Sequence, residues 1–298
     1  MDFFYRNKPW YAGQFVRNIT AIKEFPKTSL RFITTSLNKL KPILLEVLVR
    51  NVESKFLNEK IQLPIQNGEI DFDFMASFVA ELENERILKL ENYLNEIGLS
   101  DYHLTEKETQ ALENFESGKI KLKEYKLGDL FAINTYKKRF DANKVNITDK
   151  GEPYVVRTSV NNGVRGYIDE DKQFLNEGNT ISFGQDTATV YYQEQPYFTG
   201  DKIKIVKAKD SFFNRKNAFY FIASMTKSFS SFTWGGSSFS VKIIKEQPIQ
   251  IPIKENKPDY ETMETVISAI HKMVIKDVVL YVERKKRELN KLTENANA

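Results

Sequence analysis

One segment of this sequence concentrates polar side chains that could make directed contacts with a ligand. It runs from residue 154 to residue 167, and the Asn162-Gly163 pair within it favours a tight turn. Arginine pairs well with guanine, asparagine pairs with adenine, and hydroxyl groups contact either bases or phosphate oxygens. The segment therefore predicts contacts with the base edges and phosphates of a DNA duplex. The candidate contact residues are Arg157, Thr158, Ser159, Asn161, Asn162 and Arg165.

Two further polar segments follow in the same part of the chain. One lies at residues 184–187, after a predicted strand, and the other lies at residues 224–238. Small residues in both segments would let a ligand backbone approach closely. A single polar loop is more often an ordinary turn than a binding site, but three such loops in one predicted domain favour binding. The candidates from these two segments are Gln185, Lys227, Ser228 and Trp234.

Residue types that would support catalysis are scarce. The 298 residues include no cysteine, which excludes disulfides, thiolate nucleophiles and cysteine-based metal sites. Of the two histidines, His103 and His271, the second falls in an apolar helical stripe, where packing is the expected role. Asp71 and Asp73 resemble a carboxylate pair, but they begin a predicted helix, where acidic side chains cap its positive end. We therefore expect a chain that is not an enzyme and that binds no metal or cofactor.

The overall charge is only mildly basic. The formal net charge is +4 and the isoelectric point is about 8.8, values that allow a phosphate-rich partner without requiring one. No long apolar run is present, and the first residues do not have the pattern of a signal peptide. We expect a soluble cytoplasmic protein from a reducing compartment.

The chain contains an internal repeat. The pentapeptide IQLPI at residues 61–65 returns as IQIPI at residues 249–253, an offset of 188 (249 − 61). Residues 9–13 match residues 196–200 at an offset of 187 (196 − 9), one residue less than for the pentapeptides. Ordered matches spread over this length indicate a tandem duplication. The first copy begins in the middle of the repeated unit, so we expect it to lack the part that opens the second copy.

A long amphipathic helix is predicted after each pentapeptide. Apolar residues recur at spacings of three and four in residues 70–97 and in residues 258–291. Each apolar stripe is narrow and needs a partner helix, so we predict that the two helices form an intramolecular coiled coil. The alternative is two unconnected surface helices packed on separate cores. The stripe of the second helix consists of Met263, Val266, Ile267, Ile270, Met273, Val274, Val278 and Tyr281.

The fold class expected from these patterns is α+β. Thr105 and Glu108 have the spacing of a capping box for a short helix that ends near Gly118. Beyond residue 120, β-branched and aromatic runs bounded by turn residues predict a mostly β domain with one helix at about 212–227. The predicted segments are a partial β domain at 1–68, a helical spacer at 69–120, a complete β domain at 121–254 and a C-terminal coiled-coil helix at 255–298.

The partial domain should differ from the complete one. We expect residues 1–66 to keep the later strands of the domain and a helix at about 38–52 with Leu40, Leu44, Leu45 and Leu48 on one side. Such a remnant would expose apolar surface that its missing half should cover. A truncated gene, a second chain that supplies the missing half and a recombining gene cassette all remain open as explanations.

Several stretches together resemble a known protein family. They are YKLGDLFAI at 125–133, RTSVNNG at 157–163, the Pro-aromatic-aromatic-x-Gly strand at 196–200 and the IQIPI exit into a long helix. In this order, and with this duplication, the chain is similar to the specificity subunits of type I restriction–modification systems and to the recognition subunits of BcgI-like enzymes. The similarity covers nearly the whole chain.

The resemblance implies an architecture and a set of partners. It implies two target-recognition domains that each read half of a split DNA site, joined by two helices that pair into an antiparallel coil. The coil would hold the half-sites apart and dock DNA methyltransferase subunits. DNA recognition carries over to residues 121–254 alone, because the counterpart of residues 121–188 is missing from the first copy. The sequence also lacks the Asn/Asp-Pro-Pro-Tyr/Phe loop of adenine methyltransferases, so methyl transfer and cleavage would belong to partner subunits.

Two functions from different classes follow from these observations. The leading expectation is a DNA-recognition subunit without catalysis, with double-stranded DNA and methyltransferase subunits as partners and a restriction subunit as a further candidate. The alternative is a scaffold or inhibitor that binds modification subunits through the coiled coil and reads no DNA. Self-association or a complementing chain is expected for the incomplete first domain, and no membrane partner is expected.

Overall fold

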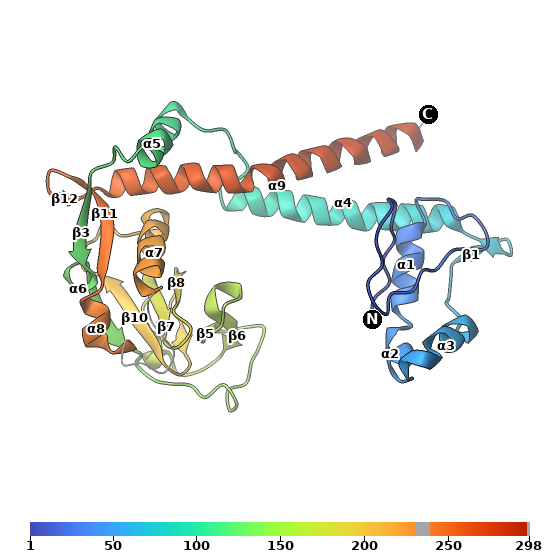
Figure 1. Cartoon of the computed structure of the whole chain (residues 1–298), viewed down its shortest axis with the longest axis horizontal. Helices are drawn as coiled ribbons and strands as arrows, with labels where there is room; N and C mark the ends of the chain where they lie inside the picture. Colours follow the sequence, from blue (N-terminus) through green and yellow to red (C-terminus); the bar gives the residue numbers. More distant parts are fainter. Residues whose placement is uncertain (231–238, 297–298) are drawn as a thin grey trace. The chain divides into compact units, whose positions relative to one another are not determined.

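The computed structural model describes residues 1–230 and 239–296 (Figure 1). The chain divides into two compact units, one formed by residues 1–100 with 277–298 and the other by residues 101–276. We call them unit 1 and unit 2. The mixture of long helices and short, mostly antiparallel strands confirms the predicted α+β class.

Unit 2 holds most of the strands, arranged in three small sheets. The sheet orders are β4-β10-β7-β8, β12-β11-β3 and β6-β5-β9, and all pairs are antiparallel except β5 with β9. Alternating apolar residues from the largest sheet face a core that also takes side chains from helices. The strands are β3 (Leu122–Lys126), β4 (Phe131–Thr135), β5 (Glu152–Val155), β6 (Val164–Ile168), β7 (Thr180–Gly184), β8 (Thr189–Gln193), β9 (Phe198–Thr199), β10 (Ile203–Ala208), β11 (Pro248–Lys254) and β12 (Lys257–Pro258).

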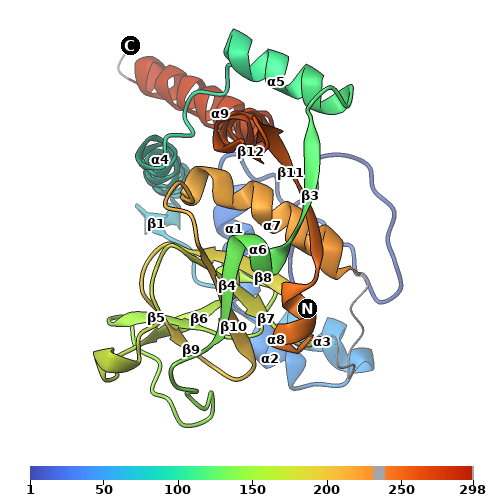
Figure 2. The ribbon, with the colours of Figure 1, turned by 90° about the vertical axis from the view of Figure 1, so that its left-hand side faces the viewer.

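Helix α7 (Arg215–Phe229) lies between these strands and the first turns of α9 (Tyr260–Ala296) (Figures 1 and 2). The Phe221 ring packs on the rings of Phe131 and Tyr260, with centroids 5.2 and 6.1 Å away. Burial of large aromatic rings supplies most of the apolar area in such a core. The shorter helices of the unit are α5 (Glu106–Glu116), α6 (Leu127–Leu130), η2 (Asn161–Gly163), η3 (Lys172–Phe174) and α8 (Val241–Lys245).

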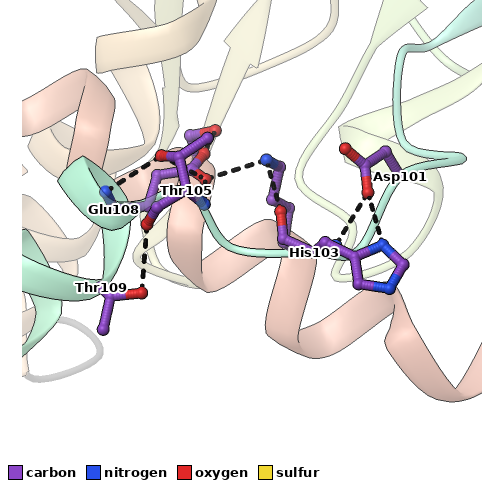
Figure 3. Close-up of polar contacts among 7 residues, drawn as sticks. Asp101, His103, Thr105, Glu108 and Thr109 are labelled. Carbon is purple, nitrogen blue, oxygen red and sulfur yellow. Dashed lines mark hydrogen bonds and ion pairs between the residues drawn. The ribbon is translucent and has the colours of Figure 1, made fainter.

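Helix α5 is fastened to α9 by a largely buried ion pair (Figure 3). The predicted capping box is confirmed, since the Thr105 hydroxyl accepts from the Glu108 backbone N–H and the Glu108 carboxylate accepts from the Thr105 N–H. The same carboxylate accepts hydrogen bonds from the Ser268 hydroxyl at 2.6 Å and from Lys272 Nζ at 2.9 Å. Lys272 Nζ also donates to the His103 carbonyl at 2.9 Å. A capping residue thus also ties its helix to a neighbour.

Unit 1 is mostly helical. The structure places no strand in residues 1–64, so the predicted later strands of the partial domain are wrong. A strand needs a hydrogen-bonded neighbour, and none is present in this segment. The described elements of the unit are α1 (Leu30–Asn38), α2 (Lys41–Leu45), η1 (Val49–Asn51), α3 (Val52–Asn58), β1 (Ile65–Gln66), β2 (Glu69–Ile70), α4 (Phe72–Glu96) and α9 from Asp277 onward.

The single helix expected at about 38–52 is also wrong. Helix α1 ends at Asn38, and α2 begins at Lys41 with Pro42 in its first turn. Proline lacks the backbone N–H that an interior helical position needs, so it starts a helix more readily than it continues one. Leu48 is extended, with ψ 147°, and is 61% exposed. The leucine spacing therefore does not describe one continuous helical face.

Within unit 1, α4 packs antiparallel against α9. Leu94 lines one hollow together with Val279 and Val282, whereas Glu91 pairs with Lys286, so the α9 number rises as the α4 number falls. Leu94, Val279 and Val282 are all buried. This pairing confirms the predicted antiparallel helix pair for the last turns of α4 and for α9 beyond Asp277.

The predicted apolar stripe of α9 is wrong in its middle. Met273 and Val274 are 54% and 73% exposed, and Tyr281 is 41% exposed. The buried positions move instead from Met263, Val266 and Ile267 in unit 2 to Val279 and Val282 in unit 1. The helix serves two cores in succession, and each core selects the helical face that it buries.

The internal repeat has a structural counterpart. In the β1–β2 hairpin, Ile65 pairs with Ile70 and Gln66 with Glu69. In the β11–β12 hairpin, Ile253 pairs with Pro258 and Lys254 with Lys257, which is the same register 188 residues later. The duplication therefore preserves hydrogen-bond geometry and not only sequence.

Candidate nucleic-acid interface

The predicted reading loop connects β5 to β6 and is held in an unusual backbone conformation. Asn161, Asn162 and Gly163 have successive φ values of 50°, 53° and 78°. Asparagine is among the few residues with a side chain that tolerate this left-handed region, and glycine occupies it freely. A Cβ added at Gly163 would lie 3.1 Å from the Tyr191 ring. The Asn-Asn-Gly sequence is thus what this turn requires.

Side-chain amides pin the loop to β8. Asn162 Nδ2 donates to the Tyr192 carbonyl at 2.8 Å, and Gln193 Nε2 donates to the Asn162 carbonyl at 3.0 Å. Asn161 Nδ2 closes the turn by donating to the Val164 carbonyl at 2.9 Å. Both asparagines remain exposed at the surface, but one donor of each is already used for structure. The loop is therefore shaped before any ligand arrives.

Arg157 takes part in a charged cluster formed by four loops. Its guanidinium pairs with Asp186 in the β7–β8 turn and lies 3.9 Å from Asp201 before β10. Lys202 Nζ lies 3.1 Å from Asp186, and Arg139 lies 3.7 Å from Asp201. Three cations face two carboxylates, which leaves one positive charge in excess (3 − 2 = +1). Sequence reasoning did not single out Arg139 or Lys202, because only the fold brings them to Arg157.

The remaining predicted contacts occupy varied positions. Gln185 Nε2 donates to the Phe239 carbonyl at 2.8 Å and so helps to hold the chain, and its backbone N–H donates to the Lys202 carbonyl. Lys227 is exposed in the last turn of α7, and the Ser228 hydroxyl is buried with no hydrogen-bond partner among the described residues. Trp234 lies outside the described residues.

Arg165 is the predicted contact with the freest side chain. It is exposed on β6, and it makes no hydrogen bond or ion pair with any residue that the structure describes. Ser159 is exposed on the adjoining loop, whereas Thr158 is half-buried. The C-terminal end of α7 lies close to Gln185, because the Phe229 ring is 4.7 Å from the ring of Phe183, two residues before Gln185. Arg157 and Gln185 thus lie near the Gly184 end of β7, whereas Asn162 is bonded to Tyr192, nearer the Thr180 end.

A comparison with protein families decides what kind of chain carries this surface. The sequence profile of the type I restriction modification DNA specificity domain matches residues 1–92 and again residues 119–280. The chain belongs to this family. The two matched regions of the specificity-domain chain fall on the two copies of the internal repeat, and the family's description names DNA specificity.

Individual relatives of the specificity-domain chain agree with this assignment. It is 31% identical over 153 residues to the specificity subunit S.BcgI of a type II restriction enzyme from Heyndrickxia coagulans. That alignment covers 51% of this chain and 44% of the subunit, so less than half of the relative's length is spanned.

Solved structures of similar proteins include two specificity subunits. The S subunit of a type I restriction-modification system from M. genitalium is 14% identical, with a TM-score of 0.44 over 84% of this chain and 68% of that chain. The HsdS subunit from Thermoanaerobacter tengcongensis is 13% identical, with a TM-score of 0.39 over 83% of this chain and 60% of that chain.

No group of three or more histidine, aspartate or glutamate side chains in the described part of the specificity-domain chain is arranged to hold a metal ion. None of the helices seen in residues 1–230 and 239–296 is long and apolar enough to cross a membrane.

Proposed function

We propose that residues 121–254 read one half of a split DNA site within a restriction–modification complex. The observation that carries this proposal is the preformed loop beside a charged cluster with one excess cation, next to the unpaired guanidinium of Arg165. A phosphate backbone selects positive charge, and a base edge selects donors held in fixed positions. A loop pinned by its own amides loses little conformational entropy on binding DNA.

The proposed contacts divide by chemistry. Arg165 and Lys227 are free to bind phosphates, because neither is used in an ion pair among the described residues. Ser159 and the second donors of Asn161 and Asn162 are available to base edges. Arg157 would have to give up its ion pair with Asp186 to bind a guanine or a phosphate. The free energy of breaking that pair would reduce the affinity gained from the contact with DNA.

Methylation of DNA by the reconstituted complex tests this proposal. We expect Arg157→Ala and Asn162→Gly in the full chain to relax sequence preference, with each lost base contact costing about 1–3 kcal/mol of discrimination. Lys216→Ala is the matched control, since Lys216 is an exposed cation in the first turn of α7, at the other end of that helix. An unchanged methylation pattern in both loop variants would contradict the proposal and favour the scaffold that reads no DNA.

We further propose that the paired segments of α4 and α9 dock methyltransferase subunits. Family membership supports this role, and the Glu91–Lys286 pair and the buried Leu94 hold the two helices together. Co-purification of the full chain with a modification subunit tests it. Loss of the complex with a surface substitution on these helices, while DNA binding persists, is the expected result.

A further inference from the structure

The β domain of unit 2 is built from two interleaved halves. Strands β8, β9, β10 and β11 come from residues 189–254, and each pairs with a strand from residues 119–188. Strand β8 pairs with β7, β9 with β5, and β11 with β3. Strand β10 lies between β4 and β7, so both of its neighbours come from the earlier half. The later half therefore cannot complete its own sheets.

Residues 1–66 correspond to this later half. At an offset of 187, DFFYR at residues 2–6 matches TVYYQ of β8, and VRNITA at residues 16–21 matches IKIVKA of β10. At an offset of 188, residues 60–66 match β11. None of these segments forms a strand in unit 1, apart from Ile65 and Gln66 in the β1–β2 hairpin. Residues 119–188 have no counterpart among the 298 residues.

The side chains that are buried in the second copy are exposed in the first. Tyr11 is 103% exposed, whereas its equivalent Phe198 is fully buried. Ile19 is 47% exposed and its equivalent Val206 is fully buried. The same contrast holds on the following helix for the pair Phe78 and Val266, with 41% against 0% exposure. Large apolar side chains exposed at several equivalent positions indicate that the first copy lacks covering partners.

The residues that pack on the later half of the second copy show which partners the first copy lacks. Phe198 packs on Phe140 with ring centroids 5.1 Å apart, and its strand pairs with Tyr154 of β5. The Tyr197 hydroxyl lies 3.1 Å from Thr180 Oγ1. These covering residues all belong to 119–188. The occupant of the exposed surface must therefore supply strands at the places of β3, β4, β5 and β7.

We propose that residues 1–66 dock a half-domain of the kind formed by residues 119–188, supplied from outside these 298 residues. The docked strands would pair with residues 2–6, 16–21 and 61–64 by strand addition, as their equivalents do in unit 2. A second copy of this chain is not the donor, because its own residues 119–188 are already paired within unit 2. This inference concerns assembly and does not depend on DNA reading.

Trp10 provides a direct reporter of docking. It is one of two tryptophans and is 42% exposed, whereas its equivalent Tyr197 is fully buried. In the acceptor, the full chain with Trp234→Phe, Trp10 is the sole fluorophore of its type. The donor is the full chain with Tyr11→Asp, Trp10→Phe and Trp234→Phe, preceded by an added copy of residues 119–188. Tyr11→Asp keeps the donor from using its own added half.

Mixing the two chains gives a clear expectation. The extended donor should form a complex with the acceptor on size-exclusion chromatography, shift the Trp10 emission to the blue and reduce acrylamide quenching several-fold. Amide hydrogen exchange at residues 61–64 of the acceptor should slow by roughly tenfold or more. An acceptor with Tyr11→Asp should show none of these changes, although Tyr11 is fully exposed and its replacement leaves the free chain folded.

The control donor has the same three substitutions and no added segment. Equal Trp10 protection by the extended and control donors would identify a second copy as the occupant and overturn the proposal. To guard against a misfolded donor, the added segment is also placed before a chain that keeps Trp10 and Tyr11. The proposal fails if Trp10 stays equally quenched in both the mixed and the fused forms while circular dichroism shows folded chains.

Discussion

Asp71 and Asp259 hold equivalent positions in two copies of one motif, 188 residues apart (259 − 71). The backbone N–H of each donates to the carbonyl of the proline seven residues earlier, Pro64 or Pro252, at 2.9 Å in both cases. Each carboxylate accepts from the backbone N–H three residues later, at 2.8 Å for Asp71 and 3.1 Å for Asp259. The same junction thus starts both long helices, and it forms whether or not the preceding strand is fully paired.

Removal of either cap should lower stability by a similar amount. We expect Asp71→Ala and Asp259→Ala each to reduce the free energy of unfolding by about 1 kcal/mol, because a free N–H is left at the helix start. Chemical denaturation followed by circular dichroism measures the loss. Asp71→Asn and Asp259→Asn retain an acceptor and should stay within a few tenths of a kcal/mol of the parent. An asparagine variant as unstable as the alanine variant would contradict the capping role.

The Glu108–Lys272 pair should make the free energy of unfolding depend on pH in the acidic range. Burial opposes the ionised form of Glu108, but hydrogen bonds from Ser268, Lys272 and Thr105 prevail and lower its pKa from 4.5 to about 2. The folded chain thus binds this proton less readily than the unfolded chain. The resulting stability is complete above about pH 4.5 and is lost as the pH falls toward 2.

We therefore expect Glu108→Gln to reduce the free energy of unfolding by about 3 kcal/mol at pH 7, because Lys272 keeps a largely buried charge without its partner. The difference from the parent chain should shrink between pH 5 and pH 2 in a urea titration series. Glu106→Gln, an exposed neighbour on the same helix, is the control and should change little at any pH. A pH-independent difference for Glu108→Gln would refute the assignment.

The helix pair of unit 1 should depend on one leucine. Leu94 is 3% exposed and lies against Val279 and Val282, so Leu94→Ala should cost about 2–4 kcal/mol of unfolding free energy. Leu88→Ala on the same helix is the control, because Leu88 is 44% exposed. Thermal unfolding of both variants checks the difference. Equal effects would mean that these helices do not pack in solution as described.

Substitutions of Asn162 and Arg165 should affect stability differently, because the Asn162 side chain holds the loop and the Arg165 side chain does not. Asn162→Ala removes the hydrogen bond to Tyr192 and forces alanine into a left-handed conformation, which should cost about 1–3 kcal/mol of stability. Asn162→Gly relieves the backbone and should recover part of that loss. Arg165→Ala should leave stability within about 0.5 kcal/mol of the parent.

The DNA readout of the same variants follows from their chemistry. If Arg165 binds a phosphate, Arg165→Ala should lower the slope of log affinity against log salt concentration by about 1. Asn162→Gly should relax sequence preference with an unchanged slope, because an amide contact releases no counterion. A fluorescence anisotropy titration at several salt concentrations distinguishes the two outcomes. An unchanged slope for Arg165→Ala would remove Arg165 from the phosphate contacts.

Local signals in the sequence predicted the features that depend on neighbouring residues. The capping box at Thr105 and Glu108 appears as expected, because both partners lie within one helical turn. Helices α4 and α9 form where a helix is predicted, and the Asn-Asn-Gly turn follows its residue types. The backbone conformation of each of these structures is specified by residues close in sequence, so the pattern is sufficient to place it.

Features that depend on distant partners could not be predicted in this way. The pairing of Arg157 with Asp186 joins residues 29 positions apart, and no local pattern indicates it. The exposure of Met273 and Val274 depends on which core receives each turn of α9. Residues 16–21 have the composition of a strand but lack neighbours, and composition alone does not supply hydrogen-bond partners.

The central position of β10 also constrains the order of events during protein synthesis. Strands β4 and β7 leave the ribosome well before Ile203, yet neither touches the other except through β10. The largest sheet can close only after this late strand emerges, which is a slow, non-local step that leaves earlier strand edges open in the nascent chain. A translational pause or a chaperone that shields residues 131–184 should raise the yield of folded protein.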